Sequence, residues 1–265
     1  MSMAARLLAS TAHRFGRSTL GGSLLRLPLA LVPKTAVVPV FGGPLRGLRW
    51  IVGSTSHGAW LGTYEHSKLL SFSSFIQERM TVWDIGANVG IYTLLSSLLV
   101  GPSGKVIAFE PLPINLRYLR EHVRLNSLHN VTVCAAAVSS RSGTVCFSPG
   151  LTRSEGKLSA NGSLQVSAIS LDEAVEQHSV PLPDLIKMDI EGGELAALQG
   201  AVAVLSGSSP IIFLATHGRR TRDECISLLD SLGYEVTPLD GDTTQTEYIA
   251  RKPGSTRTDS DPLGR

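Results

Sequence analysis

The segment TVWDIGANVGIYTLLSS, residues 81–97, constrains the fold of this 265-residue chain more than any other part of it. It begins with a short apolar run, turns at Gly86 and Gly90, and continues with a helical pattern. A buried strand, a tight glycine turn and a helix in this order start a parallel strand–helix–strand unit. The turn places backbone N–H groups and the positive helix end beside any ligand at the strand end. The segment therefore predicts an α/β fold with a ligand site at this turn.

The residues around the turn restrict the chemistry of the ligand. A dinucleotide-binding loop has the pattern G-x-G-x-x-G, but Asn88 and Ile91 occupy its third and sixth positions here. No G-K-[ST] sequence follows, so the segment is not a P-loop. Asp84 adds a carboxylate two residues before Gly86, and this charge would repel a phosphate. The turn thus favours a ligand with positive charge and hydroxyl groups, such as S-adenosylmethionine, which has an ammonium, a sulfonium and a ribose.

A second acidic residue, Glu110, closes the next apolar run at residues 105–111. It follows Gly86 by 24 positions, close to the separation of about 20 residues at which an acidic side chain binds ribose hydroxyls in such folds. Its two oxygens can accept hydrogen bonds from both ribose hydroxyls. Taken singly, Asp84 is also compatible with a strand-end turn, and Glu110 with a solvated strand end. Together, at this spacing, they favour a cofactor site.

Downstream, apolar runs of strand length alternate with helical patterns, as expected for a parallel sheet. Residues 143–149 and 163–170 predict a hairpin, and residues 234–239 and 246–252 a terminal antiparallel pair, because their connection is too short for a crossover. The predicted fold class is α/β, with a mostly parallel seven-stranded sheet, helices on both faces and an antiparallel edge hairpin. The other predicted strands are 131–139, 183–190 and 210–216; the predicted helices are 114–126 (Leu116, Leu119 and Val123 toward the sheet), one after Gly193 (Leu195, Leu198, Val202 and Leu205 on one face) and one marked by Cys225, Leu228, Leu229 and Leu232.

The N-terminal region is basic: seven Arg and Lys residues, and no Asp or Glu, precede Glu65. This composition is typical of an organelle transit peptide; the alternative is a basic amphipathic helix that leads into the domain or rests on a membrane surface. The apolar run at 24–41 is interrupted by Arg26, Lys34 and three prolines, so no transmembrane helix is predicted. A cytoplasmic location is predicted, with an organelle as the alternative.

Charge and cysteine usage exclude further classes. The formal net charge of +2 is too near zero, and the catalytic part too poor in basic clusters, to predict nucleic acid as a partner. The three cysteines are far apart and in no CxxC spacing, so neither a zinc site nor a disulfide framework is predicted. A reducing compartment is the simpler interpretation.

Three motifs together resemble the FkbM-family methyltransferases, a group of S-adenosylmethionine-dependent enzymes: DIGANVG (84–90), FEP (109–111) and IKMDIEGGE (186–194). The resemblance covers residues 40–250 in outline. It implies a Rossmann-like class I methyltransferase fold and methyl transfer to an oxygen of a small molecule, sugar or glycan. It also implies cofactor contacts from Asp84, Gly86, Ala87, Asn88, Gly90 and Glu110, with the adenine near Ala136 and Ala137, where backbone groups or Ser139 would replace a polar side chain.

One departure from the family pattern lies in FLATHG, residues 213–218. The family commonly has Glu-x-His at this strand end, whereas this chain has Ala215 in place of Glu and keeps His217. If the Glu binds substrate or orients the histidine, this chain must do so otherwise.

Four residues are candidates for the chemistry. Lys187, Asp189 and Glu191 alternate along one strand end and share a face there. Methyl transfer depends mainly on positioning, and a base such as Asp189 or His217 helps to remove the hydroxyl proton. In the structural alternative, Lys187 only pairs with Asp189, Glu191 and Glu194 offset a helix dipole, and His217 is structural. Asp189 and Glu191 could also hold a divalent cation; no metal site is predicted, and metal dependence stays open.

The predicted segments are a basic extension at 1–40, a lid or cap at 41–80, the Rossmann-like domain at 81–252 and a disordered tail at 253–265. Trp60, Tyr64 and Glu65 would form the lid over the acceptor, although both aromatic residues fit the core equally well. The leading hypothesis is an S-adenosylmethionine-dependent O-methyltransferase. The alternatives are a cofactor-binding module without catalysis and a nicotinamide dehydrogenase, which Asn88 and Ile91 disfavour.

Overall fold

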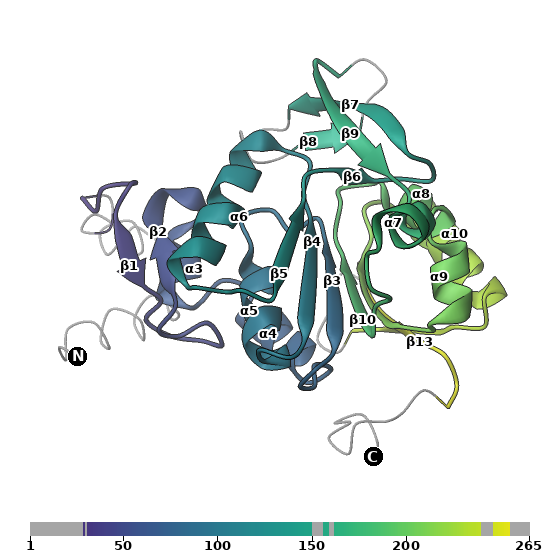
Figure 1. The fold of residues 1–265 in the computed structure, drawn as a ribbon, viewed down its shortest axis with the longest axis horizontal. Coiled ribbons are helices and arrows are strands. Elements are labelled where there is room, and N and C mark those ends of the chain that lie inside the picture. Colours follow the sequence, from purple (N-terminus) through teal and green to yellow (C-terminus); the bar gives the residue numbers. More distant parts are fainter. Residues whose placement is uncertain (1–28, 30, 150–155, 159–161, 240–245, 255–265) are drawn as a thin grey trace.

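A seven-stranded sheet forms the centre of the molecule (Figure 1). The computed structural model describes residue 29 and residues 31–149, 156–158, 162–239 and 246–254. The sheet contains β3 (Thr81–Ile85), β4 (Lys105–Phe109), β5 (Val131–Cys134), β10 (Leu185–Met188), β11 (Ile211–Ala215), β12 (Glu235–Pro238) and β13 (Glu247–Arg251). Its order is β12-β13-β11-β10-β3-β4-β5, in which β11 to β5 are parallel and β13 is antiparallel to both neighbours. The predicted mostly parallel sheet with an antiparallel edge pair is confirmed.

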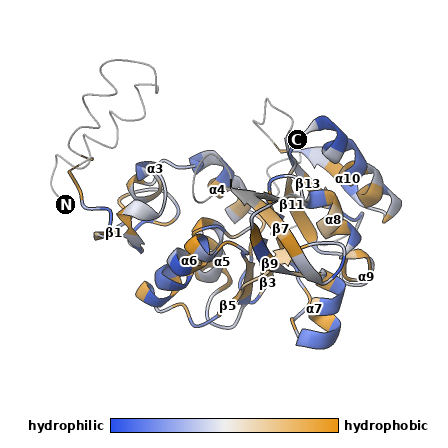
Figure 2. Cartoon of the chain, turned by 90° about the horizontal axis from the view of Figure 1, so that it is seen from above, coloured by the Kyte–Doolittle hydropathy of each residue, from blue (hydrophilic) through white to orange (hydrophobic). Residues whose placement is uncertain are grey.

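Helices cover both faces of this sheet, because its strands carry apolar side chains on both faces. The helices are α4 (His66–Ser73), α5 (Ile91–Val100), α6 (Pro113–Leu125), α7 (Leu171–His178), α8 (Glu194–Gln199), α9 (Val202–Gly207) and α10 (Arg219–Ser231). Val82 and Phe213 pack in one core cluster with residues of α4 and α5. Trp83 and Leu214 pack on the other face with residues of α8, α9 and α10. Figure 2 shows orange strands between helices that are blue on their outer surfaces.

The segment before the sheet shares the sheet's core. β1 (Val37–Pro39) and β2 (Arg49–Ile51) form an antiparallel pair, and η1 (Val52–Ser54) and α3 (His57–Leu61) follow. Trp50 of β2 is fully buried, and its ring stacks on that of His122 in α6 with 3.9 Å between the centroids. The predicted boundary between the basic extension and the lid, at residue 40, falls between β1 and β2, which are paired strands. The division of the chain into segments stays a prediction.

The strand predicted at 131–139 is wrong in its second half. β5 ends at Cys134, and the Ala136 N–H bonds back to the Cys134 oxygen at 3.0 Å, which turns the chain out of the central sheet. The next strand, β6 (Ala137–Val138), belongs to a second sheet in the order β6-β9-β7-β8. Its other strands are β7 (Gly143–Pro149), β8 (Gly156–Leu158) and β9 (Leu164–Ile169). β7 and β9 are antiparallel, which confirms the predicted hairpin.

The single helix predicted after Gly193 is also wrong, since α8 and α9 are separate. At Gly200 an added Cβ would lie 2.2 Å from the main-chain oxygen of Ser139, so the chain turns where two segments cross closely. The carboxylate of Asp172 then accepts from the N–H groups of Ala203 and Val204 at 3.1 and 2.9 Å and caps α9. α7, which carries Asp172, was not predicted.

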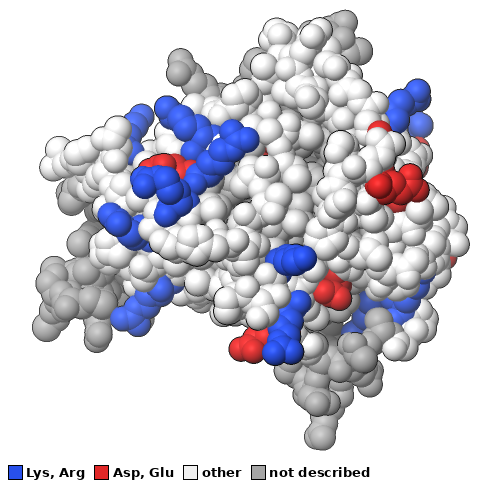
Figure 3. Space-filling model, in the orientation of Figure 1, with Lys and Arg blue, Asp and Glu red and all other residues white. Residues whose placement is uncertain are grey.

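Basic side chains gather on the face of the molecule where α6 lies (Figure 3). Arg117, Arg120 and Arg124 of this helix are exposed. Among the residues that the structure describes, no helix combines the length and the apolar character needed to cross a membrane. Most of the predicted basic extension and tail, at 1–28 and 255–265, lies outside the described residues.

Candidate active site

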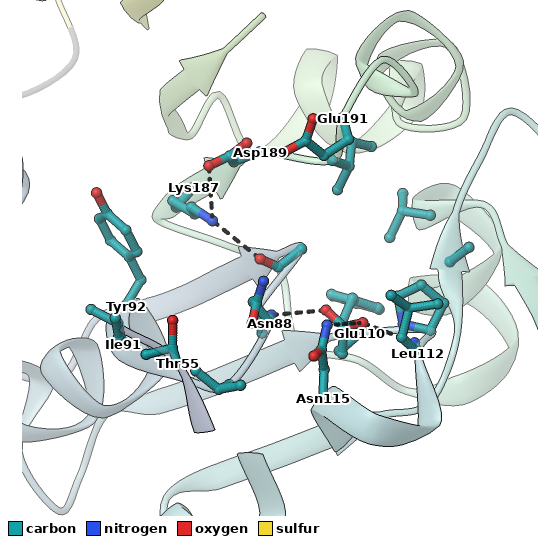
Figure 4. Close-up of a pocket in the computed structure, with 18 of the residues that line it drawn as sticks. Thr55, Asn88, Ile91, Tyr92, Glu110, Leu112, Asn115, Lys187, Asp189 and Glu191 are labelled. Carbon is teal, nitrogen blue, oxygen red and sulfur yellow. Dashed lines mark hydrogen bonds and ion pairs between the residues drawn. The ribbon is translucent and has the colours of Figure 1, made fainter. Parts of the chain in front are cut away.

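A pocket lies at the carboxyl ends of β3, β4 and β10 (Figure 4). Its walls come from the glycine turn (residues 86–90), the end of β4, the start of β6, the end of β10 and the segment before the sheet. Open α/β sheets bind their ligands at this edge. The residues that line it include Tyr64, Glu65, Gly86, Ala87, Asn88, Tyr92, Glu110, Leu112, Asn115, Ala136, Ala137, Val138, Phe147, Lys187, Asp189 and Glu191.

The glycine turn needs its small residues for two different reasons. At Gly86 the backbone has φ +80°, and an added Cβ would lie 2.0 Å from the Asp189 main-chain oxygen. Gly90 begins α5 with φ +100°, and there a Cβ would meet Leu119 at 2.7 Å. Asn88 also has a positive φ of 51°, a conformation that asparagine tolerates better than most residues. The asparagine in place of a middle glycine therefore matches the local backbone.

Glu110 holds this turn in place. Its Oε2 accepts from the N–H of Asn88 at 2.8 Å, and its Oε1 accepts from the N–H of Leu112 at 2.8 Å and from Asn115 Nδ2 at 3.3 Å. Burial raises the pKa of Glu110, while the N–H groups of Leu112 and Asn88 oppose that rise. The carboxylate lines the pocket and connects the turn to the start of α6.

Asp84 does not line the pocket, in contrast to its predicted contact with a ligand. It is fully buried, and its Oδ2 accepts from Thr93 Oγ1 at 2.5 Å. Lys187 Nζ lies 3.6 Å from Asp84 Oδ1 and donates to the Gly86 oxygen at 3.2 Å. Burial alone would lower the pKa of Lys187, but the carboxylates of Asp84, Asp189 and Glu65 outweigh it and raise this pKa. The charge of Asp84 is thus offset from within the chain.

The remaining predicted catalytic residues lie together at the ends of β10 and β11. His217 Nε2 is 3.8 Å from Asp189 Oδ1 and 3.6 Å from Glu191 Oε2. Asp189 and Glu191 line the pocket. His217 contacts both of them but does not line the pocket itself. His217 Nδ1 is 2.7 Å from Oε1 of Glu194, a fully buried carboxylate. This hydrogen bond raises the pKa of His217.

The predicted adenine side of the pocket contains Ala136, Ala137, Val138 and Phe147. Ser139 is not among the lining residues, and its N–H bonds to the Ile169 oxygen at 3.0 Å. Ser139 is therefore not one of the pocket's polar groups, and a hydrogen bond from backbone groups to the adenine stays a prediction.

The predicted lid divides into core and pocket residues. Trp60 is 4% exposed and packs edge-to-face against Phe41, so it belongs to the core. Tyr64 and Glu65 line the pocket, and Glu65 Oε2 accepts from Tyr92 OH at 2.9 Å. The pairing of Tyr92 with Glu65 was not predicted, and the helical position of Tyr92 just after the glycine turn was the available signal.

Ala215, the departure from the family pattern, lies directly opposite Glu247 in the register of β11 and β13. Opposite residues of an antiparallel pair place their side chains on the same face. Glu247 is buried and paired with Lys68. The histidine two residues beyond Ala215 is oriented by Glu194, for which a helix-dipole role and a functional one were both open.

Comparisons with known proteins bear on the family and the fold. A model of the methyltransferase FkbM domain matches residues 84–236. The hexuronic acid methyltransferase AglP of Haloferax volcanii is 32% identical over 169 residues, which are 63% of this chain and 69% of that protein. The crystal structure of a methyltransferase FkbM from Methylobacillus flagellatus KT is 20% identical with a TM-score of 0.52. That match covers 68% of this chain but only 47% of the solved one, and it supports the fold alone.

Proposed function

The chain belongs to the FkbM methyltransferase family, and we propose that it transfers the methyl group of S-adenosylmethionine to a hydroxyl group of a sugar. The relative from Haloferax volcanii is named for action on a hexuronic acid, so a uronic acid is the first acceptor class to test. One observation carries the proposal: the glycine turn and Glu110 share a single pocket with Asp189 and Glu191 (Figure 4). A cofactor end and an acceptor end are thereby within one cavity.

The residues present fit a cofactor that has a ribose. Gly86 and Glu110 line the same pocket, and a carboxylate has about four acceptor positions, of which Glu110 uses three internally. The position that remains on Glu110 would accept from one ribose hydroxyl, with the adenine beside Ala136 and Ala137. When bound, S-adenosylmethionine supplies a methyl group on a positively charged sulfur that leaves as a neutral thioether.

Asp189 is the residue to which we assign the hydroxyl proton. It lines the pocket, its side chain is 38% exposed, and its Oδ2 lies 3.9 Å from Lys187 Nζ. The carboxylate takes the proton as the oxygen–carbon bond forms and the carbon–sulfur bond breaks. Lys187 positions Asp189 and the Gly86 carbonyl, since it contacts both. Most of the rate enhancement comes from alignment of the two reacting groups.

Calorimetry with S-adenosylhomocysteine, the demethylated cofactor, tests the cofactor half. We expect binding by the intact chain and binding weaker by about 10-fold or more in Glu110→Gln, because a hydrogen bond to a charged group is worth about 1.5–3 kcal/mol. The exposed residue Asp230 supplies a matched control, and Asp230→Asn should bind normally. If the intact chain does not bind the compound, the proposal is wrong.

Transfer of a radiolabelled methyl group tests the acceptor half. Glucuronic acid, its methyl glycoside and a neutral hexose glycoside are offered in parallel, and label is expected on a sugar hydroxyl. Asp189→Asn should abolish this transfer and keep S-adenosylhomocysteine binding. Cofactor binding without transfer to any sugar would favour the binding module instead.

A further inference from the structure

Asp189, Glu191 and His217 form a carboxylate–histidine cluster at the ends of β10 and β11. One ligand atom from each residue can be chosen so that all three atoms lie within 4.8 Å of one another, and His217 Nε2 lies 3.8 Å from Asp189 Oδ1 and 3.6 Å from Glu191 Oε2. The residues are neither buried nor fully exposed, and two of them line the pocket. In Figure 4, Asp189 and Glu191 lie side by side across the pocket from Asn88 and Glu110. Two carboxylates and one imidazole are a common ligand set for divalent metal ions.

The distances within this cluster favour a shared cation over direct pairing. The two contacts of His217 Nε2, at 3.6 and 3.8 Å, are longer than hydrogen bonds. Neighbouring ligands around an octahedral ion, at about 2.1–2.4 Å from its centre, are about 3.0–3.4 Å apart. Small side-chain rotations would therefore bring the three atoms to coordination distance.

A second, independent feature lies on the far side of the imidazole. Glu194 is fully buried, and its Oε1 faces His217 Nδ1 at 2.7 Å and accepts from the Gly192 N–H at 3.0 Å. Its Oε2 has no hydrogen-bond partner within the part of the chain that the structure describes. A carboxylate in this place keeps the proton on Nδ1 and directs the lone pair of Nε2 toward Asp189 and Glu191. Metal-binding histidines usually have such a partner.

We propose that Asp189, Glu191 and His217 bind one divalent first-row transition-metal ion next to the acceptor. An octahedral ion held by three protein ligands keeps about three positions open. Two neighbouring oxygens of one sugar, either adjacent hydroxyls or a hydroxyl and a carboxylate, fill two of them. The ion makes the bound hydroxyl more acidic, and Asp189 Oδ2, which faces Lys187, takes its proton. Preference for a chelating acceptor rests on the proposed function, whereas metal binding does not.

Manganese binding to the chelator-treated full chain tests the site. Electron paramagnetic resonance should show uptake of one Mn²⁺ per chain, with coupling to an imidazole nitrogen that disappears in His217→Gln. Asp189→Asn and Glu191→Gln should also weaken uptake. Glu194→Gln should weaken it about 10–100-fold, the effect typical of losing the partner of a metal-bound histidine. The exposed His129 supplies the matched control, and His129→Gln should take up the ion normally.

Thermal unfolding and S-adenosylhomocysteine binding, measured on each variant, separate loss of the site from loss of the fold. Absence of Mn²⁺ uptake by the intact chain, or uptake that persists in His217→Gln and Glu194→Gln, would overturn the three-ligand site. Uptake without cofactor binding would instead contradict the proposed function and leave the metal site standing.

Discussion

Gly86 and Asp189 meet where the glycine turn crosses the end of β10: a Cβ on Gly86 would lie 2.0 Å from the Asp189 oxygen. Gly86→Ala must therefore displace the acceptor end of the pocket from the cofactor end. We expect loss of S-adenosylhomocysteine binding in calorimetry and a lower unfolding temperature.

Gly101 provides the matched control for this substitution, because its φ is +69° but no atom lies within 4 Å of an added Cβ. Gly101→Ala should cost only the backbone strain of this Gly-favoured conformation (φ +69°, ψ −177°), about 1–3 kcal/mol, and keep cofactor binding. Equal effects of the two substitutions would show that strain, not the close crossing, explains the need for glycine at 86.

Lys187 stabilises the fold as the cation beside the buried Asp84. Lys187→Met leaves that carboxylate without its ion-pair partner, a change that typically costs about 3–5 kcal/mol. Urea unfolding should show this loss, and Asp84→Asn in the same chain should recover part of it. Lys105→Met, at an exposed lysine, is the control. Unchanged stability in Lys187→Met would limit Lys187 to a role in the reaction.

His122 makes stability depend on pH. Its Nε2 accepts from the Ile51 N–H at 3.1 Å, its Nδ1 lies 2.8 Å from the Val89 oxygen, and burial lowers its pKa from 6.5 to about 4. Because the unfolded chain binds the proton more readily, the contribution is complete above pH 6.5 and is lost as the pH falls toward 4. This pKa shift of His122 corresponds to about 3 kcal/mol of the free energy of unfolding.

Urea unfolding between pH 4 and pH 8 measures this contribution as the difference between the intact chain and His122→Gln. Between pH 6.5 and pH 4, the free energy of unfolding should fall less steeply with pH in His122→Gln than in the intact chain. In His129→Gln it should fall as in the intact chain. If both variants keep the full slope, the pH dependence comes from other groups.

Asp172 fixes the start of α9. Asp172→Ala removes the acceptor for the N–H groups of Ala203 and Val204, and loss of such a cap costs about 0.5–2 kcal/mol. Denaturant unfolding should show this loss, and Asp172→Asn should show part of it, because the amide keeps only one of the two acceptor oxygens. The exposed Glu176 on the same helix is the control, and a loss of equal size in Glu176→Ala would exclude capping as the cause.

The sequence predicted the fold well where the signal is local. β3, the glycine turn and α5 are consecutive, and apolar periodicity with two glycines specifies them. The break between α8 and α9 depends on Gly200 meeting Ser139, which lies 61 positions earlier, and no local pattern reports such a crossing.

In the candidate site, too, local spacing was predictable from the sequence, whereas contacts between distant residues were not. The spacing of Gly86 and Glu110 predicted two residues that do line one pocket. Asp84 was expected to face the ligand, but its partner Lys187 comes from another strand and offsets its charge below the pocket. Glu194 and His217 are 23 positions apart, so their hydrogen bond could be found only in three dimensions.

A residue in a sheet has two neighbourhoods, one along the chain and one across the strands. At the position where the family resemblance implies the carboxylate of a Glu, this chain has Ala215. Along the row that crosses β11 and β13, Glu247 stands directly opposite Ala215, so that row of the sheet still carries one. The acidic side chain of this row therefore belongs to β13, where its charge is paired with that of Lys68.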